Sequence, residues 1–207
     1  MIIEIIEIRK NGEIDPIAEG NSSMISVIMP TTDLSQAILS ARRMKDNAGM
    51  PMRMIIVQDN ISQGYIKTLN MAVSKLASEF IAYVAQDSLS GKSWLKLAYD
   101  ALISQQKSLC AFNDGKFEGK LASFGLVKKS FCEQLYGEGH IFYPGYHSHR
   151  ADDELTLYAR LNKQISYVPQ AIMLEVDYRL NRPLNPNDVE LFKIRKKQIQ
   201  SEYGKTD

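Results

Sequence analysis

The 207-residue sequence is poor in cysteine and has almost no net charge. Its two cysteines, Cys110 and Cys132, lie far apart and form no CxxC pair, which excludes a zinc knuckle and a dithiol redox motif. We therefore expect both thiols to be small buried apolar groups. The formal charge of +1 argues against broad electrostatic capture of nucleic acid, so no nucleic-acid partner is expected.

Long apolar runs are also absent from the sequence. No stretch approaches the roughly 20 apolar residues that a transmembrane helix needs. Glu4 and Glu7 interrupt the amino-terminal segment where a secretory signal would need an unbroken apolar run. These observations predict a cytoplasmic protein without a transmembrane segment.

The first half of the sequence contains a regular alternation of apolar strands and amphipathic helices. Strands are predicted at 25–29, 54–57 and 80–85, and a helix follows each of them. This order is typical of a mainly parallel, doubly wound, Rossmann-like α/β sheet. With 44% hydrophobic residues and no low-complexity linker, residues 1–207 are expected to form a single domain.

The ends and the second half of that domain differ from the first half. The Asn11-Gly12 pair predicts an N-terminal hairpin at 1–20. The alternating pattern occupies 24–108, whereas 109–180 has short strands, turns, a Gly-, Tyr- and His-containing loop at 136–150, a helix from Asp152 to about Leu161 and a strand at 165–168. Residues 187–203 read as a C-terminal amphipathic helix, a pattern that fits a homo-oligomer contact and a membrane-surface contact equally well.

Polar residues follow all three strands of the first half at the point where each strand ends. They are Pro30-Thr31-Thr32, Asp59-Asn60 and Gln86-Asp87-Ser88. Ligands of parallel α/β sheets bind at the carboxyl ends of the strands, so these groups are expected to share one site. Two carboxylates there repel each other unless a cation is shared, and Mg²⁺ or Mn²⁺ bridging to phosphate oxygens would supply one. The structural alternative is that Asp59 and Asp87 only cap turns and the helices that follow.

A second acidic cluster, Asp152-Asp153-Glu154, opens the helix after the 136–150 loop. Acids suit the positive end of a helix dipole, which gives them a purely structural interpretation. The preceding loop, with His147 and His149, instead has the character of a binding loop, and a carboxylate beside it can take a proton from an acceptor hydroxyl.

A phosphate-binding P-loop is excluded at Ser90-Gly91-Lys92-Ser93. The motif needs glycine five residues before Gly91, where this chain has Gln86. The same segment also contains Asp87, a negative charge where phosphates would lie. Ser90 is better interpreted as a cap of the helix that contains Trp94.

Segments from Ile25 to about Asp177 resemble, in order, the inverting family 2 glycosyltransferases of the GT-A fold, and within them the small bacterial and phage-type members. ISVIMPTT resembles their first strand SVIIPTYN, and IIVQDN resembles IIVVDDGS. GYIKTLNMAVSKLASEFIAYVAQDS resembles the run GxxxARNxGxxxAxGEYIxFLDDDD, which ends in the DxD element. ADDELTLYAR resembles the EDxEL segment.

The resemblance implies a metal-dependent transfer of a sugar, with inversion, from a nucleotide-diphosphate donor to a hydroxyl of a saccharide or lipid-linked acceptor. It implies Mn²⁺ or Mg²⁺ as cofactor, held by Asp87. The residues that it implies for the donor nucleotide are Pro30, Thr31, Thr32, Asp59, Asn70 and Gln86. Those for the acceptor are Trp94, His149 and Glu154, and the base is Asp152 or Asp153.

The sequence departs from the family pattern at the DxD element and after the last strand. Ala85 replaces the first aspartate of the element and Gln86 occupies its middle position. The histidine often found after the last strand is absent, and Glu175 or Asp177 stands nearby. Alternatives are therefore a catalytically inactive nucleotide-sugar-binding protein, a nucleotidyltransferase on a similar sheet, or an α/β interaction domain. A nucleotidyltransferase usually has a Gly-rich basic loop after the first strand, which Thr31-Thr32-Asp33 is not.

Overall fold

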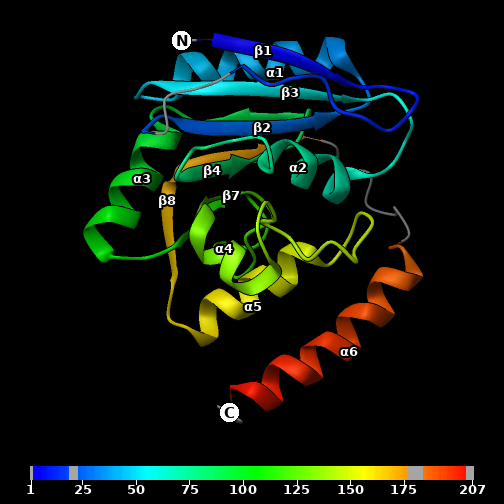
Figure 1. Ribbon diagram of the computed structural model, residues 1–207. Helices are drawn as coiled ribbons and strands as arrows, with labels where there is room; N and C mark the ends of the chain where they lie inside the picture. The colour runs from blue at the N-terminus through cyan, green and yellow to red at the C-terminus, as the bar shows by residue number, and fades with distance from the viewer. Residues whose placement is uncertain (1, 19–22, 177–183, 204–207) are drawn as a thin grey trace.

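The computed structural model describes residues 2–18, 23–176 and 184–203 (Figure 1). The helices are α1 (Leu34–Asn47), α2 (Tyr65–Val73), α3 (Trp94–Gln105), α4 (Lys129–Tyr136), α5 (Ala151–Leu161) and α6 (Pro186–Glu202). The strands are β1 (Ile2–Ile8), β2 (Ile25–Thr31), β3 (Met52–Asp59), β4 (Phe80–Tyr83), β5 (Ser88–Ser90), β6 (Leu109–Asn113), β7 (Gly125–Lys128) and β8 (Ile165–Glu175). None of the described helices is long and apolar enough to cross a membrane.

The eight strands form one curled sheet in the order β1-β3-β2-β4-β7-β6-β8-β5. Strands β1, β3, β2 and β4 run parallel to one another, as do β6 and β8. β7 is antiparallel to both its neighbours and β5 is antiparallel to β8. The predicted α/β class, mainly parallel with a smaller mixed part in the second half of the chain, is confirmed.

Helices cover both faces of the sheet, as doubly wound folds require. Successive strand residues point to opposite faces, so Val27 and Met54 pack under α1 and α3, while Ile28 and Ile55 pack under α2, α4 and α5. All seven residues of β2 are buried, which explains why its sequence is mostly apolar and lacks a strict alternation of apolar and polar residues.

Both cysteines are buried and unpaired, as the sequence predicts. Burial is the main cause that raises the pKa of the Cys110 thiol to about 11, and burial also raises the pKa of Cys132. Neither thiol is therefore a nucleophile at neutral pH.

The expected N-terminal hairpin is replaced by an edge strand. The turn at Asn11-Gly12 forms, with Gly12 at φ 83° and the Arg9 N–H donating to the Glu13 carbonyl at 2.8 Å. The returning segment meets β1 only at an isolated bridge between Ile8 and Ile14, however, and β1 pairs along its whole length with β3. Pairing with β3 adds main-chain hydrogen bonds along the strand and buries Ile8 completely. The isolated bridge has two main-chain hydrogen bonds, from Arg9 to Glu13 and from Asp15 to Glu7.

Strand β8 extends well beyond the predicted 165–168 and continues to Glu175. Pro169 lies where the pairing between β6 and β8 shifts register, and its carbonyl accepts a hydrogen bond from the Asn113 side chain at 2.8 Å. Proline is tolerated in strands at such irregularities. The extension carries Glu175 and Val176 to the edge of the sheet where β2, β3 and β4 end.

Candidate functional site

A cavity of about 550 Å³ opens at the carboxyl ends of β2, β3 and β4. Its described lining residues are Pro30, Thr31, Thr32, Gln36, Asp59, Ser62, Gly64, Tyr65, Thr68, Ala85, Gln86, Asp87, Glu175 and Val176. Parallel sheets converge their loops at this edge. The structure thus brings together the residues predicted for the donor and the metal, with the exception of Asn70.

Gln86 ties the end of β4 to the loop after β2. Its Oε1 lies 2.6 Å from Thr31 Oγ1 and accepts the N–H groups of Thr32 at 2.9 Å and Asp33 at 3.2 Å. The Asp33 carboxylate in turn caps α1 by accepting the Gln36 N–H at 3.1 Å. The middle position of the expected DxD element is therefore part of the scaffold that shapes this wall of the cavity.

Asp59 organises the loop between β3 and α2. It is buried, and its carboxylate accepts backbone N–H groups from Ile61 at 3.3 Å, Gln63 at 3.2 Å and Gly64 at 3.0 Å. Gly64 has φ 99°, and a Cβ there would lie 2.6 Å from the His147 carbonyl, so this position needs glycine. The capping role considered for Asp59 is present, while its side chain also lines the cavity.

Asp87 and Glu175 are the acids that a bound metal ion would meet at the mouth of the cavity. Glu175 pairs with Lys116, and its β-partner across β5 and β8 is Ser88, next to Asp87. In the described ranges, no three His, Cys, Asp or Glu residues form a group that could hold a metal ion. Mg²⁺ in nucleotide sites is commonly held by one or two carboxylates plus substrate phosphates and water. A single carboxylate such as that of Asp87 is compatible with an ion of that kind. Asp177 lies outside the described residues.

The described lining of the cavity carries negative side chains and no lysine, arginine or histidine. Asp59, Asp87 and Glu175 supply the acids. A diphosphate entering this cavity would meet like charge, which is unfavourable unless a cation neutralises it. The electrostatics of the cavity thus favour a ligand that brings a divalent ion.

Asp152 lies in the first turn of α5, close to the same end of the sheet. Burial, and after it the negative charge of Asp153, raises the pKa of Asp152 to about 7, while Arg150 acts in the opposite direction. Burial, and then the Asp152 charge, raises the pKa values of Tyr65 and Tyr83. Tyr65 lines the cavity, whereas Asp152 is not among its described lining residues.

Asp153 is engaged differently from its neighbour. Its carboxylate forms an ion pair with Arg150 at 3.1 Å, and Arg150 precedes α5 in the left-handed region at φ 70°. In the part of the chain that is described, Asp152 makes no ion pair, so the two candidate bases are in different environments.

Two predicted site residues lie away from the cavity. Trp94 is fully buried, donates its indole N–H to the Met44 carbonyl at 2.9 Å and packs edge-on against Phe112. Its role toward an acceptor stays a prediction. Asn70 is buried and donates to the Phe142 carbonyl at 2.9 Å while accepting the N–H of Ile141 at 3.2 Å. It holds the loop before α5, and its role toward the nucleotide stays a prediction.

The predicted acceptor residues Glu154 and His149 also make protein contacts. Glu154 is fully buried, and Tyr146 and Arg195 both donate to its carboxylate. Its contact with an acceptor stays a prediction. His149 is partly exposed, and its Nδ1 accepts the Asn185 N–H at 3.2 Å. Sequence reasoning missed Tyr65, which follows Gly64 and could have been found there, and Arg195 and Asp188, for which no local pattern exists.

No protein-family model and no curated protein matches the sequence. Solved structures do match the fold. S. aureus TarS with UDP-GlcNAc gives a TM-score of 0.62 at 15% identity over 86% of this chain and 66% of that chain. The mannosyltransferase PcManGT from Pyrobaculum calidifontis with GDP-Man and Mn²⁺ gives 0.56 at 15% identity over 91% and 64%. Glucosyl-3-phosphoglycerate synthase from Mycobacterium tuberculosis with Mn²⁺, UDP and phosphoglyceric acid gives 0.54 at 12% identity over 89% and 80%.

These likenesses establish the architecture: the chain has the GT-A glycosyltransferase fold. It spans 66%, 60% and 39% of the length of three TarS structures. Membership of family 2 stays a prediction from the sequence.

Proposed function

We propose that this protein is a glycosyltransferase that moves a sugar from a nucleotide-diphosphate donor to an acceptor hydroxyl. The observation that carries the proposal is the cavity at the ends of β2, β3 and β4, which gathers Thr31, Asp59 and Asp87 in a GT-A fold. The solved neighbours that share this fold were crystallised with UDP-GlcNAc or with GDP-Man and Mn²⁺, which supports a ligand of the same class here.

On the donor side, Pro30, Thr31 and Thr32 would line the nucleotide, with Asp59 at the base or ribose. Asp87 would hold Mn²⁺ or Mg²⁺ against the diphosphate. When bound, the ion neutralises the negative charge that develops on the leaving group. Gln86 would act indirectly by fixing the loop that carries Thr31.

On the acceptor side, Asp152 would take the proton of the acceptor hydroxyl as its oxygen forms a bond to the sugar carbon. The bond from that carbon to the diphosphate breaks, and the nucleoside diphosphate leaves. Attack from the face opposite the leaving group would invert the configuration, as the resemblance implies. A base whose pKa is about 7 suits proton transfer near neutral pH, and the ion pair between Asp153 and Arg150 favours Asp152 for this role.

The acceptor would be a saccharide or a lipid-linked saccharide, as the sequence predicts. His149 is the predicted acceptor residue that keeps part of its side chain exposed. A cytoplasmic location and a homo-oligomer stay predictions.

A catalytically inactive nucleotide-sugar binder is the second candidate, because Ala85 stands where the first aspartate of a DxD element is expected. Such a protein would bind the donor but neither transfer nor hydrolyse its sugar. A nucleotidyltransferase is not favoured, since the neighbours reported above are glycosyltransferases.

A thermal-shift panel of UDP-, GDP-, CDP- and dTDP-sugars, each with Mn²⁺ and with chelator, tests the donor site. A donor at about 100 times its dissociation constant adds roughly 2.7 kcal/mol to the stability of the folded state. We expect one nucleotide class to stabilise the protein, and the effect to be lost on chelation and in Asp87→Asn. Asp100→Asn is the matched control, since this exposed aspartate on α3 pairs with Lys96 and is not among the described lining residues of the cavity. No stabilisation by any donor would contradict the proposal.

A further inference from the structure

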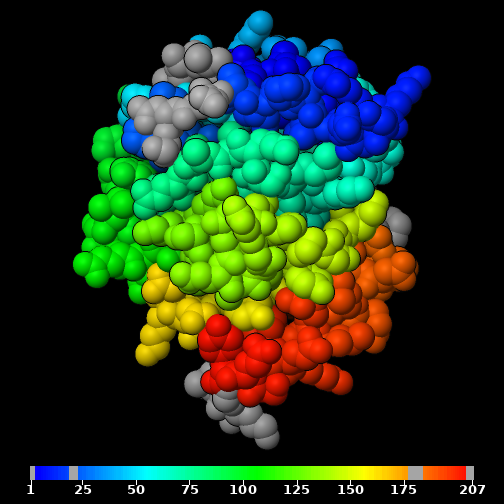
Figure 2. Space-filling model, in the orientation of Figure 1, coloured from blue at the N-terminus to red at the C-terminus, as the bar shows by residue number. Residues whose placement is uncertain are grey.

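Helix α6 lies outside the two helical layers of the sheet and packs beside α5 (Figure 1). In the space-filling view its orange atoms border the yellow-green loop that precedes α5 (Figure 2). The buried positions Asp188 and Ile199 and the part-buried Arg195 recur at helical spacing, so they share the face that meets the body of the protein. Two of these three residues are charged, which is unusual for the inward face of a helix.

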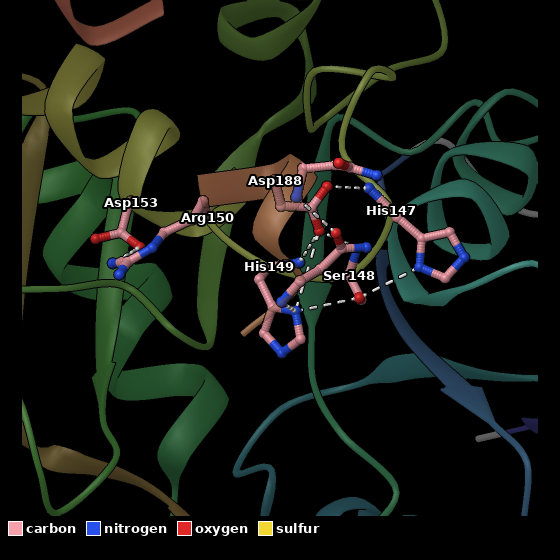
Figure 3. A network of polar contacts seen from close by, with 8 residues as sticks. His147, Ser148, His149, Arg150, Asp153 and Asp188 are labelled. Carbon is pink, nitrogen blue, oxygen red and sulfur yellow. Dashed lines mark hydrogen bonds and ion pairs between the residues drawn. The ribbon is translucent and has the colours of Figure 1, made fainter. Parts of the chain in front are cut away.

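Asp188 binds three consecutive backbone N–H groups of the loop (Figure 3). Its Oδ1 accepts from His147, and its Oδ2 accepts from Ser148 and His149, each at 2.9 Å. Successive N–H groups that point at one anion form a backbone nest. Although burial alone would raise it, these hydrogen bonds hold the pKa of Asp188 below its usual value. The carboxylate therefore stays charged and bound at neutral pH.

Arg195 makes the second polar contact of α6. Its Nε and Nη2 donate to the two oxygens of Glu154 at 2.6 and 2.7 Å, and its guanidinium lies 3.4 Å from the centre of the Tyr143 ring. Tyr146 also donates to Glu154, at 2.7 Å. A bidentate pair of this kind fixes direction as well as distance.

These two contacts fall on either side of the proposed base. Residues 147–149 precede Asp152, and Glu154 follows it within the same first turn of α5. The loop held by Asp188 also touches the cavity wall, because the His147 carbonyl lies against Gly64. The segment that carries Asp152 is thus held by α6 at both ends.

We propose that α6 clamps the first turn of α5, with Asp188 and Arg195 as positioning residues that set where the Asp152 carboxyl lies relative to the donor cavity. The inference rests on the proposed role of Asp152 as the base. Neither residue needs to touch a substrate. Misplacement of a reacting group by about 1 Å can cost roughly 100-fold in rate, so loss of a positioning residue should lower turnover without weakening donor binding.

Asp188→Asn is the first test, because an amide of the same size cannot accept all three N–H groups. Glu190→Gln on the same helix is the matched control: it removes the same charge from a residue that is exposed and pairs with Lys193. In Asp188→Asn we expect kcat to fall about tenfold to 100-fold with the donor KM unchanged within about twofold. Glu190→Gln should match the unsubstituted protein in both.

A readout that needs no activity accompanies the kinetics. The carboxyl carbon of Asp152 is followed by NMR across a pH titration, identified by its absence in Asp152→Asn. Its midpoint should move by about half a pH unit or more in Asp188→Asn, since the carboxyl changes its burial, and stay in place in Glu190→Gln. If no donor supports transfer in the unsubstituted protein, the proposed function fails while this titration still decides on the clamp.

The inference is overturned if Asp188→Asn is folded and leaves both kcat and the Asp152 midpoint unchanged. It is also overturned if kcat and donor affinity fall together in proportion to lost thermal stability. Should Asp188→Asn not fold, Arg195→Lys takes its place, because lysine keeps the charge but loses the bidentate geometry. The same fall in kcat at unchanged donor KM is then expected, and an unchanged kcat counts against the clamp.

Discussion

The two sides of the candidate site are built in different ways. On the proposed donor side, the parallel strands β2, β3 and β4 bring Thr31, Asp59 and Asp87 to one edge of the sheet. On the proposed acceptor side, the loop before Asp152 is held by α6, and the hydrogen bonds of Asp188 reach residues 39 to 41 positions earlier in the chain. The strand-end residues are positioned by the order of the strands in the sheet. The loop before α5 is positioned by the packing of α6.

Removal of the proposed base is the largest expected effect and tests the acceptor side directly. Asp152→Asn should lower kcat about 10²- to 10⁴-fold, the usual contribution of general-base catalysis, while the donor-induced thermal shift is kept. Asp153→Asn is the comparison, with a fall of less than about tenfold because that carboxylate is paired with Arg150. Equal losses in the two variants, or none in either, would be inconsistent with Asp152 as the base.

Breaking the ion pair between α5 and α6 tests the same side through stability. Arg195→Met leaves the fully buried Glu154 carboxylate without its cation and should cost about 3–5 kcal/mol of unfolding free energy, measured by urea denaturation. The double substitution Glu154→Leu with Arg195→Met should recover most of that loss, because an apolar pair of similar volume often replaces a buried ion pair at little cost. A double variant as unstable as the single one would contradict this account.

The pKa of Asp152 predicts a pH-dependent stability of opposite sign to that of most carboxylates. Its folded-state pKa of about 7 lies above the unfolded value, so between about pH 4 and 7 the folded state binds more protons. Stability therefore falls as pH rises through that window. The unfolding free energy of Asp152→Asn, minus that of the unsubstituted protein, should therefore be about 1–3 kcal/mol larger at pH 8 than at pH 5. If this difference in unfolding free energy is the same at both pH values, Asp152 has an ordinary pKa.

The smallest effect is expected on the donor side. Thr31→Val removes the hydroxyl that donates to Gln86 Oε1. The N–H groups of Thr32 and Asp33 still donate to that oxygen. We expect a loss of about 0.5–1.5 kcal/mol in unfolding free energy and a modest rise in donor KM. A donor KM unchanged in a variant that is destabilised as expected would show that this wall of the cavity does not depend on the Thr31 hydroxyl.

The difference between the two sides also explains what the sequence could predict. Periodicity and strand-end residues predict the sheet, its doubly wound faces and most of the cavity, since each of these depends on short segments read in order. Trp94, Asn70 and Glu154 match family positions but lie in the core, because their burial depends on neighbours such as Phe142 and Arg195 that are distant in sequence. The register shift at Pro169, which lets β8 reach Glu175, likewise leaves no signal in the strand itself.

The distance along the chain between Asp188 and the loop that it holds has a consequence for biosynthesis. A ribosome releases the sheet and its donor cavity first, and the N–H groups of His147, Ser148 and His149 have no carboxylate to bind until α6 emerges. A chain that ends before residue 186 would therefore contain the described residues that line the cavity, but the loop before α5 would lack the carboxylate that holds it. Completion of the last described helix would then set the moment at which the protein can begin turnover.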